Sequence, residues 1–303
     1  MQKLTEREER ILSAIRTFCA QKGYAPSVRE LCAALGYRST STVHLYLDRL
    51  EQLGYLRREG GKSRSIALVS TPHAPEWDLS ALKTANLFRS PEHTLAADYL
   101  MQFEYPWQAL AGLKDFICAL GKTLSPAEYE QVGESVWISK RAKIAPTAAI
   151  DGPAVIIGPD AEIRHCALIR ENVLIGAGVN VGHCTGVKNA ILFDEVQVPH
   201  YNYVGDSILG YRAHMGGAAL TSNLKSDKSN VRILVQGERI DTGRQKLGAM
   251  LGDYVEIGAG AVLNPGTVIG EHSNVYPLVT VRGYVPPHHI FKSQENVVPK
   301  IER

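Results

Sequence analysis

The chain has 303 residues, of which 45% are hydrophobic and 21% are charged. This composition is typical of a folded globular protein with two or three domains. No run of about 18 apolar residues could cross a membrane, and the first residues do not resemble a signal peptide. The five cysteines are scattered and form no CxxC pair, which favours reduced thiols. We therefore expect a cytoplasmic protein with no membrane partner.

The formal net charge of +2 conceals an uneven distribution along the chain. Residues 1–70 hold 12 Lys and Arg against 7 Asp and Glu, whereas the remainder holds 21 against 24. A basic head on a slightly acidic body suggests that the head alone meets a polyanion.

Residues 1–70 contain the signals of three helices followed by two short strands. Capping-box patterns begin the first two helices at Thr5 and Ser27, and residues 39–41 offer a cap to the third. Residues 55–58 and 65–68 have the composition of strands joined by a basic turn. This order predicts an α+β winged helix-turn-helix.

Three segments of the head, residues 25–31, 36–44 and 50–56, resemble the DNA-binding domain of the LexA repressor. The resemblance implies that residues 1–70 bind double-stranded DNA. The third helix would offer hydroxyls and an imidazole to base edges, while basic residues would hold phosphates. The predicted DNA-binding residues are Arg38, Ser39, Ser41, Thr42, His44, Leu45, Arg49, Lys62 and Arg64.

A winged helix used for protein contacts is the alternative for this head. The resemblance to LexA ends at Ser70, so the self-cleaving peptidase domain of that family is not expected here. Residues 71–78 instead form a proline-bearing linker.

Residues 79–132 have helical spacing, with Leu110, Leu113 and Ile117 on one face. We expect this block to be a small helical cap that covers the open end of the repeat domain in residues 133–303. The terminal units of a repeat domain need such a cover because their outer faces would otherwise expose the core.

An aliphatic or other large apolar residue recurs at every sixth position in much of residues 133–303. The series runs without a break from Ile157 to Phe193 and returns in residues 209–221 and 251–281. A period of six fits neither a helix nor an alternating strand. It predicts a solenoid of short strands, in which three corners close one coil of 18 residues.

Glycine often follows the aliphatic residue of the repeat, as at Gly158, Gly176 and Gly182. We expect these glycines to form the corners, because glycine tolerates a positive φ. The repeat resembles the left-handed parallel β-helix of the hexapeptide-repeat acyltransferases. A β-helix kept only as a scaffold is the alternative.

Residues 18 positions apart should lie one above the other, about 4.8 Å apart. Arg170 and Lys188 are related in this way. Two stacked cations suit the binding of a phosphate between them, although a pair of solvated charges is the alternative.

Two His-Cys pairs, at residues 165–166 and 183–184, have the same spacing of 18. Adjacent residues of a strand point to opposite faces, so the four side chains do not converge on one metal ion. We expect ordinary stacking of His165 on His183 and of Cys166 on Cys184, and no metal.

A second resemblance lies in the segments around Arg170, Lys188, His200 and residues 221–223. They resemble the acetyltransferase domain of the bifunctional enzymes that make UDP-N-acetylglucosamine. Residues 221–225 and 243–253 resemble the archaeal sugar-1-phosphate nucleotidylyltransferase/amino-sugar acetyltransferases in particular. The nucleotidylyltransferase half of those enzymes is missing from this sequence, so a pyrophosphorylase activity is not expected.

This resemblance implies roles for seven residues. His200 would be the general base, which suits an imidazole with a pKa of about 6.5. Asn223 would orient the amine or the acetyl group. The residues that would bind the substrate are Arg170, Lys188, Tyr203, His214 and Lys228.

The sequence therefore predicts three parts: a winged helix, a small helical segment and a left-handed parallel β-helix. The resemblances imply an acetyl-CoA-dependent transferase that acts on an amino-sugar phosphate or a nucleotide-linked relative. They also imply a homotrimer. The competing hypothesis is a transcription regulator whose β-helix senses a sugar phosphate, a nucleotide sugar or a CoA ester without turnover.

Overall fold

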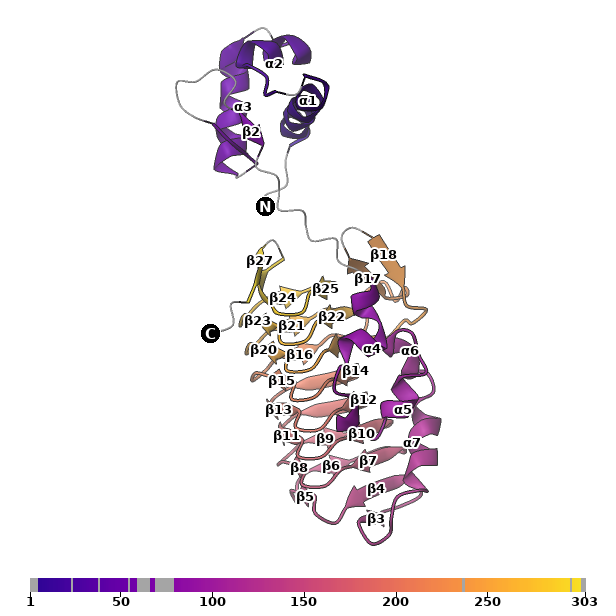
Figure 1. Ribbon diagram of the computed structural model, residues 1–303. Coiled ribbons are helices and arrows are strands. Elements are labelled where there is room, and N and C mark those ends of the chain that lie inside the picture. The colour runs from indigo at the N-terminus through magenta and orange to yellow at the C-terminus, as the bar shows by residue number, and fades with distance from the viewer. Residues whose placement is uncertain are drawn as a thin grey trace. The chain divides into compact units, whose positions relative to one another are not determined.

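The computed structural model describes residues 5–22, 24–37, 39–53, 55–58, 66–68, 79–235, 238–294 and 296–300. It divides into two compact units, Met1–Glu76 and Trp77–Arg303. The predicted fold class is confirmed: a head of three helices and two strands, a few short helices, and a parallel β-solenoid (Figure 1). No helix among the described residues is long and apolar enough to cross a bilayer.

The head packs three helices against a two-stranded sheet. Its buried core includes Ile11, Leu31, Val43 and Leu47. The elements are α1 (Glu6–Lys22), α2 (Val28–Leu35), α3 (Thr40–Gln52), β1 (Leu56–Arg57) and β2 (Ala67–Leu68), with β1 and β2 antiparallel.

The predicted caps begin the helices of the head. At α1, the backbone N–H of Thr5 donates to Glu8 Oε2 over 2.6 Å, and that of Glu8 donates to Thr5 Oγ1 over 3.4 Å. Ser27 forms the same box at α2, which ends at Gly36 with φ 70°. At α3, Ser39 Oγ accepts from the backbone N–H of Ser41 over 3.2 Å. Each of these bonds satisfies a helix-end N–H that would otherwise lack a partner.

Three faces of parallel strands make up the solenoid, and the seven-residue strands β12 (Gly186–Leu192) and β14 (Tyr203–Leu209) bend from one face onto another. The first face contains β4 (Val136–Ser139), β7 (Val155–Ile157), β10 (Val173–Ile175), the second halves of β12 and β14, β19 (Ala249–Leu251), β22 (Thr267–Ile269) and β25 (Tyr284–Val285). The second face contains β5 (Lys143–Ile144), β8 (Glu162–Ile163), β11 (Asn180–His183), β13 (Gln197–His200), β15 (His214–Met215), β20 (Glu256–Ile257), β23 (Asn274–Val275) and β26 (His289–Ser293). The third face contains β6 (Ala149–Ile150), β9 (Leu168–Ile169), the first halves of β12 and β14, β16 (Leu220–Thr221), β21 (Val262–Leu263) and β24 (Thr280–Val281).

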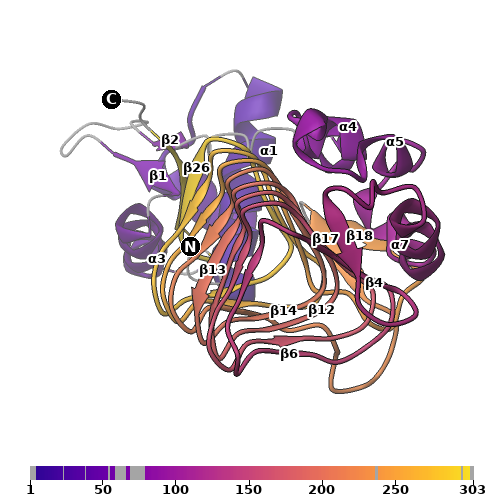
Figure 2. The same cartoon turned by 90° about the horizontal axis from the view of Figure 1, so that it is seen from below.

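Antiparallel pieces flank these faces. Strand β3 (Tyr129–Gln131) pairs with β4, and β27 (Asn296–Pro299) pairs with β26. Residues 223–248 form an excursion from the coils, which contains a hairpin of β17 (Arg232–Val235) and β18 (Glu238–Asp241). Viewed along the axis, the coils superpose into a single prism (Figure 2). Inward aliphatic residues such as Ile163, Val187 and Leu263 are fully buried inside it.

The glycines that follow the aliphatic residues do not form the corners, so this prediction is wrong. Positive φ belongs instead to other residues, such as Asn172 (59°), Cys184 (54°) and Tyr201 (52°). The glycines lie where successive coils come closest: a Cβ on Gly182 would lie 1.5 Å from the Pro199 carbonyl oxygen. The repeated glycine therefore permits close stacking rather than turning.

The coil length changes at the middle of the solenoid. Val155 pairs with Val173, 18 residues on, but Val173 pairs with Ala190 and Ala190 with Ser207, each 17 residues on. The shortening falls on the third face, between the corners at Cys184 and Asn189 and again in the next coil. The sixfold series from Ile157 to Phe193 therefore does not keep one structural register.

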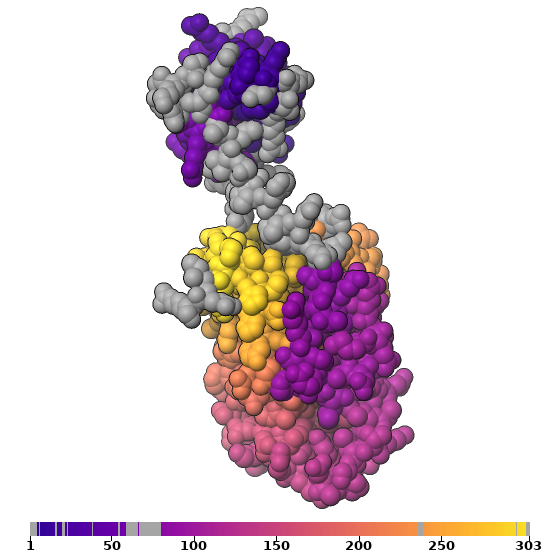
Figure 3. All heavy atoms as spheres, viewed as in Figure 1, coloured from indigo at the N-terminus to yellow at the C-terminus, as the bar shows by residue number. Residues whose placement is uncertain are grey.

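The sequence predicts that the helical segment covers an open end of the solenoid, and this prediction is wrong. The segment lies along the side of the solenoid. Its elements are η1 (Leu79–Leu82), α4 (Thr84–Leu87), η2 (Pro91–His93), α5 (Ala97–Leu100), α6 (Pro106–Ala109) and α7 (Leu113–Gly121). Phe88 stacks on Phe193 at 5.0 Å between ring centroids, and the backbone N–H groups of Arg89 and Ser90 donate to the buried Asp253. In the space-filling view the segment forms a continuous band along the coils (Figure 3). Its apolar faces thus bury the outside of the first face.

Replacement of Gly182 by alanine should destabilise the solenoid, because the new Cβ would collide with the backbone of the next coil. We expect a loss of about 1–3 kcal/mol or more in the free energy of unfolding. Gly186→Ala is a matched control, since its Cβ would make only a 3.4 Å contact with the Tyr203 ring. Denaturant unfolding of both variants tests this prediction, and equal stabilities would contradict it.

Candidate functional site

Arg170 and Lys188, the two cations of the predicted phosphate clamp, lie one above the other in successive coils. A carboxylate lies between them. Arg170 donates its backbone N–H to Val187 O, which places it beside Lys188. Glu171 Oε2 lies 3.4 Å from Arg170 Nε, and Glu171 Oε1 lies 3.2 Å from Lys188 Nζ. Arg170 corresponds to Lys188 in the next coil, and the corner residue Asn172 corresponds to the corner residue Asn189. Glu171 therefore has no counterpart in that coil, which is one residue shorter.

Glu171 is held in its charged form at this position. Burial opposes ionisation, but its own backbone N–H, Lys188 and Arg170 outweigh that effect and lower the pKa of the carboxyl. Glu171 therefore offsets one of the two positive charges of this pair within the chain. A bound phosphate would compete with Glu171 for the same two cations.

Tyr203 and Asn223 meet on the third face, next to Lys188. Lys188 pairs in register with Gly205, over which the Tyr203 ring lies: a Cβ on Gly205 would come within 2.5 Å of the Tyr203 hydroxyl. Asn223 Nδ2 lies 3.4 Å from that hydroxyl. Because residue 205 is a glycine, the Tyr203 side chain can lie along the strand and reach Asn223.

A buried carboxylate, which the sequence did not identify as important, fixes the Asn223 amide. Asp206 is 4% exposed and accepts hydrogen bonds from Asn189 Nδ2 over 2.8 Å and from Asn223 Nδ2 over 2.5 Å. Because the amide nitrogen of Asn223 is engaged in this way, its Oδ1 remains the side-chain atom that can accept a bond from a ligand.

The excursion contributes a cation near this carboxylate. Arg244 from the excursion is half-buried, and burial lowers the pKa of its guanidinium while the charge of Asp206, and then that of Tyr99, act in the opposite direction. Tyr99, on α5, donates its hydroxyl to Ala109 O over 2.6 Å. Arg244 thus interacts with Asp206 of the solenoid and with Tyr99 of the helical segment.

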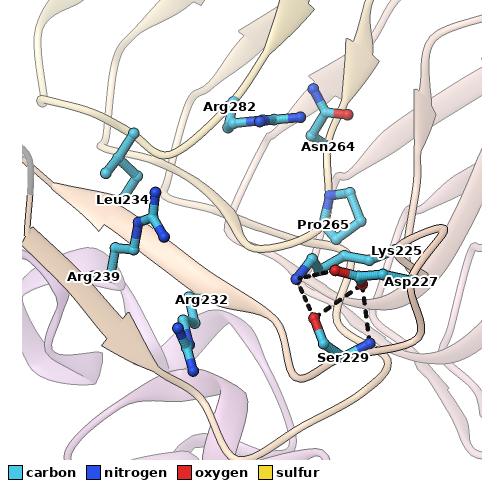
Figure 4. A pocket seen from close by; sticks show the side chains of 9 residues that line it. All are labelled: Lys225, Asp227, Ser229, Arg232, Leu234, Arg239, Asn264, Pro265 and Arg282. Atoms are coloured by element: carbon cyan, nitrogen blue, oxygen red, sulfur yellow. Dashed lines mark hydrogen bonds and ion pairs between the residues drawn. The ribbon is translucent and has the colours of Figure 1, made fainter.

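A basic pocket of about 520 Å³ lies between the hairpin and the last coils (Figure 4). Arg232 and Arg239 come from the hairpin, whereas Asn264 and Arg282 come from the third face. Lys225 completes the cationic lining, next to Asp227 and Ser229.

Two of the four cations in this pocket have no ion-pair partner among the described residues. Arg232 lies 3.5 Å from Asp241, and Lys225 lies 3.5 Å from Asp227. Arg239 and Arg282 have no such contact within the described part of the chain. Unpaired guanidinium groups around a cavity of this size are suited to an anion with more than one charged group.

The basic pocket adjoins a second, smaller cavity. A second cavity of about 310 Å³ shares Lys225, Asn264 and Arg282 with it and extends to Ser222. Ser222 lies in the chain directly before Asn223. We call the two cavities together the basic groove.

The two predicted histidines do not contact the clamp within one chain. His200 ends β13 on the second face, where its Nδ1 lies 3.2 Å from His183 Nδ1. His214, on β15, lies 2.7 Å from Glu256 through its Nδ1. Within the described ranges, no hydrogen bond or ion pair joins either histidine to Lys188 or Asn223.

Lys228 lies on the exposed turn of the excursion, with φ 55°. It lines neither cavity of the basic groove. The groove itself was missed from the sequence, because only the fold brings the hairpin arginines to Arg282.

In the head, α3 presents several of the predicted DNA-binding residues to solvent. Ser39, Ser41, His44 and Leu45 are exposed, with Leu45 67% exposed, and Thr42 is partly exposed. Arg38, Lys62 and Arg64 lie outside the described residues.

Arg49 contacts another part of the head. Its Nε lies 2.7 Å from Glu8 Oε1, although the Arg49 side chain remains 58% exposed. Bonds from the Thr5 backbone and hydroxyl are the main causes that lower the pKa of Glu8, and Arg49 adds to them. Arg49 therefore joins α3 to α1, and its remaining N–H groups face solvent.

The stacked His-Cys pairs form no metal site in the described residues, where no group of three His, Cys, Asp or Glu could hold an ion. Cys166 and Cys184 are exposed free thiols at two successive corners. The backbone N–H of Cys184 donates to His165 O over 3.1 Å, which confirms the stacking.

Replacement of Asp206 by asparagine should destabilise the chain, because either orientation of the new amide would place an NH₂ group against a donor from Asn189 or Asn223. We expect the free energy of unfolding to fall by about 1–3 kcal/mol. Asp227→Asn, on an exposed turn, should change it by less than about 0.5 kcal/mol. Denaturant unfolding measures both, and an unchanged Asp206→Asn variant would contradict the role given to the buried carboxylate.

Two family models match separate parts of the chain. Residues 1–65 match the family "LexA DNA binding domain", and residues 152–297 match the family "GMPPB C-terminal domain". The chain is 32% identical over 176 residues to the LexA repressor of Caldicellulosiruptor saccharolyticus. That match covers 56% of this chain and 87% of the repressor.

The chain is also 34% identical over 136 residues to the bifunctional sugar-1-phosphate nucleotidylyltransferase/acetyltransferase of Sulfurisphaera tokodaii. That match covers 45% of this chain and only 32% of the relative, so the chain spans about a third of it. PerB of Caulobacter crescentus, solved in complex with CoA and GDP-perosamine, is 17% identical with a TM-score of 0.27. It is matched over 54% of this chain and 56% of its own. The chain belongs to the LexA family through its DNA-binding domain, which it joins to a hexapeptide acetyltransferase-like β-helix domain related to GlmU.

Proposed function

We propose that this protein is a DNA-binding acetyltransferase that moves the acetyl group of acetyl-CoA to the amine of an amino-sugar phosphate. The contact of Tyr203, Asn223 and Asp206 beside Lys188 is the observation that carries the proposal. The similarity to the Sulfurisphaera enzyme supports the reaction class.

The basic groove suits acetyl-CoA in charge. Its cationic end, with Arg239 and Arg282, would take the phosphates of the co-substrate. The thioester would then lie near Asn223, because the groove continues to Ser222. Arg170 and Lys188 would hold the phosphate of the acceptor in place of Glu171, with Tyr203 positioning it.

In the proposed reaction, the neutral amine of the sugar attacks the thioester carbonyl carbon. A C–N bond forms, the C–S bond breaks, CoA leaves as the thiolate, and His200 removes a proton from the nitrogen. Because His200 and Asn223 lie without contact on different faces of one chain, we propose that a homotrimer brings His200 of one copy to the groove of the next. His214 and Lys228 are proposed to line the same site.

His200→Ala should lower acetyl transfer by about 10²- to 10⁴-fold, since a positioned general base contributes about that much. The measurement is release of CoA from acetyl-CoA with glucosamine 1-phosphate as the acceptor, and His165→Ala is the control. If the unaltered protein binds both compounds but transfers nothing, the β-helix is a ligand sensor and not an enzyme.

The head is proposed to bind duplex DNA through α3. Leu45→Glu places a negative charge on the exposed face of α3 and should weaken DNA binding by at least about tenfold, because it repels the phosphates. Leu95→Glu, at an exposed position in the other unit, is the control. Fluorescence anisotropy with a labelled duplex measures both. Binding by the unaltered chain should also weaken steeply with added salt, and affinity independent of salt would contradict the proposal.

A further inference from the structure

Two imidazoles share a hydrogen bond at the end of the second face. His183 and His200 are register partners on the parallel strands β11 and β13. Their Nδ1 atoms lie 3.2 Å apart, and their rings are tilted by 54° with centroids 4.8 Å apart. Two nitrogen atoms at this distance share one proton, so one ring donates and the other accepts.

The backbone that carries this pair is rigid. The buried Asn202 accepts from the His200 N–H over 2.9 Å, and its Nδ2 donates to Gly216 O and Ala219 O in the next coil. The backbone of His200 is therefore held by hydrogen bonds that reach the next coil.

His183 is held in place from its other side. The Tyr201 ring meets the His183 ring edge-on, at 4.7 Å and 83°. His183 is partly buried, whereas His200 is exposed. Gly217 of the next coil lies against His200, where a Cβ would make an ordinary 3.6 Å contact with the Cβ of His200.

The direction of the shared hydrogen bond decides whether His200 can act as a base. If His183 donates, neutral His200 carries its proton on Nε2 and that atom cannot accept another. If His200 donates from Nδ1, its Nε2 has a free lone pair that faces solvent. In the second arrangement His183 also continues to accept from Nδ1–H after His200 becomes charged.

We propose that His183 is a positioning residue that accepts the Nδ1–H of His200 and so presents the bare Nε2 of His200 to the acceptor amine. This inference rests on the proposed function, in which His200 is the general base. It adds a residue for which the spacing of 18 had suggested only stacking on His165. In this arrangement the acceptor amine is the nucleophile, His200 is the base, and the imidazole of His183 orients the base.

The first test reads the tautomer directly and does not depend on activity. In the full-length protein labelled with ¹⁵N-histidine, NMR should show neutral His200 protonated at Nδ1 and bare at Nε2. In His183→Phe, which keeps a ring against Tyr201 but removes the acceptor, His200 should change toward the Nε2–H form. A proton on His200 Nε2 in the unaltered protein would overturn the inference, whether or not the protein transfers acetyl groups.

The second test compares two replacements by kinetics. His183→Phe should lower kcat by up to about 10²-fold with little change in KM, as expected when a reacting group is misplaced. His183→Asn should restore most of kcat, because its Oδ1 stands where the accepting Nδ1 stood. His165→Phe, one coil below and bonded to Thr147, should leave kcat unchanged. Equal losses in His183→Phe and His183→Asn would contradict a role as acceptor.

Discussion

The close vertical stacking of the coils is the constraint on which the rest of this structure depends. Neighbouring parallel strands lie about 4.8 Å apart, so most side chains of the strands have a counterpart directly above or below them. Glycines such as Gly176 and Gly182 make this approach possible because any side chain there would enter the next coil. Each functional group is therefore held by its neighbours in a column, and the Asn189–Asp206–Asn223 ladder and the His183–His200 pair are two results of that rule.

A small departure from the regular repeat coincides with the candidate site. The coils that carry Lys188 and Tyr203 are one residue shorter than the coil below them, and the missing residue is on the third face. This change leaves Glu171 at the step, where its carboxylate lies between Arg170 and Lys188 and offsets one of their two positive charges. The phosphate that we propose to bind there would have to displace this carboxylate.

Much of the fold could be predicted from the sequence, because it follows from local rules. The capping boxes at Thr5 and Ser27 begin helices as expected, and the period of six predicts the solenoid. The stacking of Arg170 with Lys188 and of His165 with His183 also follows from that period.

The shortened coils could not be predicted from the sequence. Val187 and Phe193 keep the sixfold spacing, but Ile175 pairs with Leu192 and not with Phe193. Nor could the position of the helices, because their apolar faces fit the side of a solenoid as well as its end. The basic groove depends on a hairpin that folds back onto Arg282, and no local pattern shows such a contact.

The excursion of residues 223–248 has a consequence for how this domain can change. It leaves and rejoins the solenoid at nearly one point: the backbone N–H of Leu247 donates to Asn223 O over 3.0 Å, and Leu209 pairs directly with Leu251 across the gap. The hairpin is nevertheless not an independent appendage, because Val231, Ile233 and Val235 are buried in the same core cluster as the coils. A change in its length or composition would therefore alter the groove and the scaffold's core together.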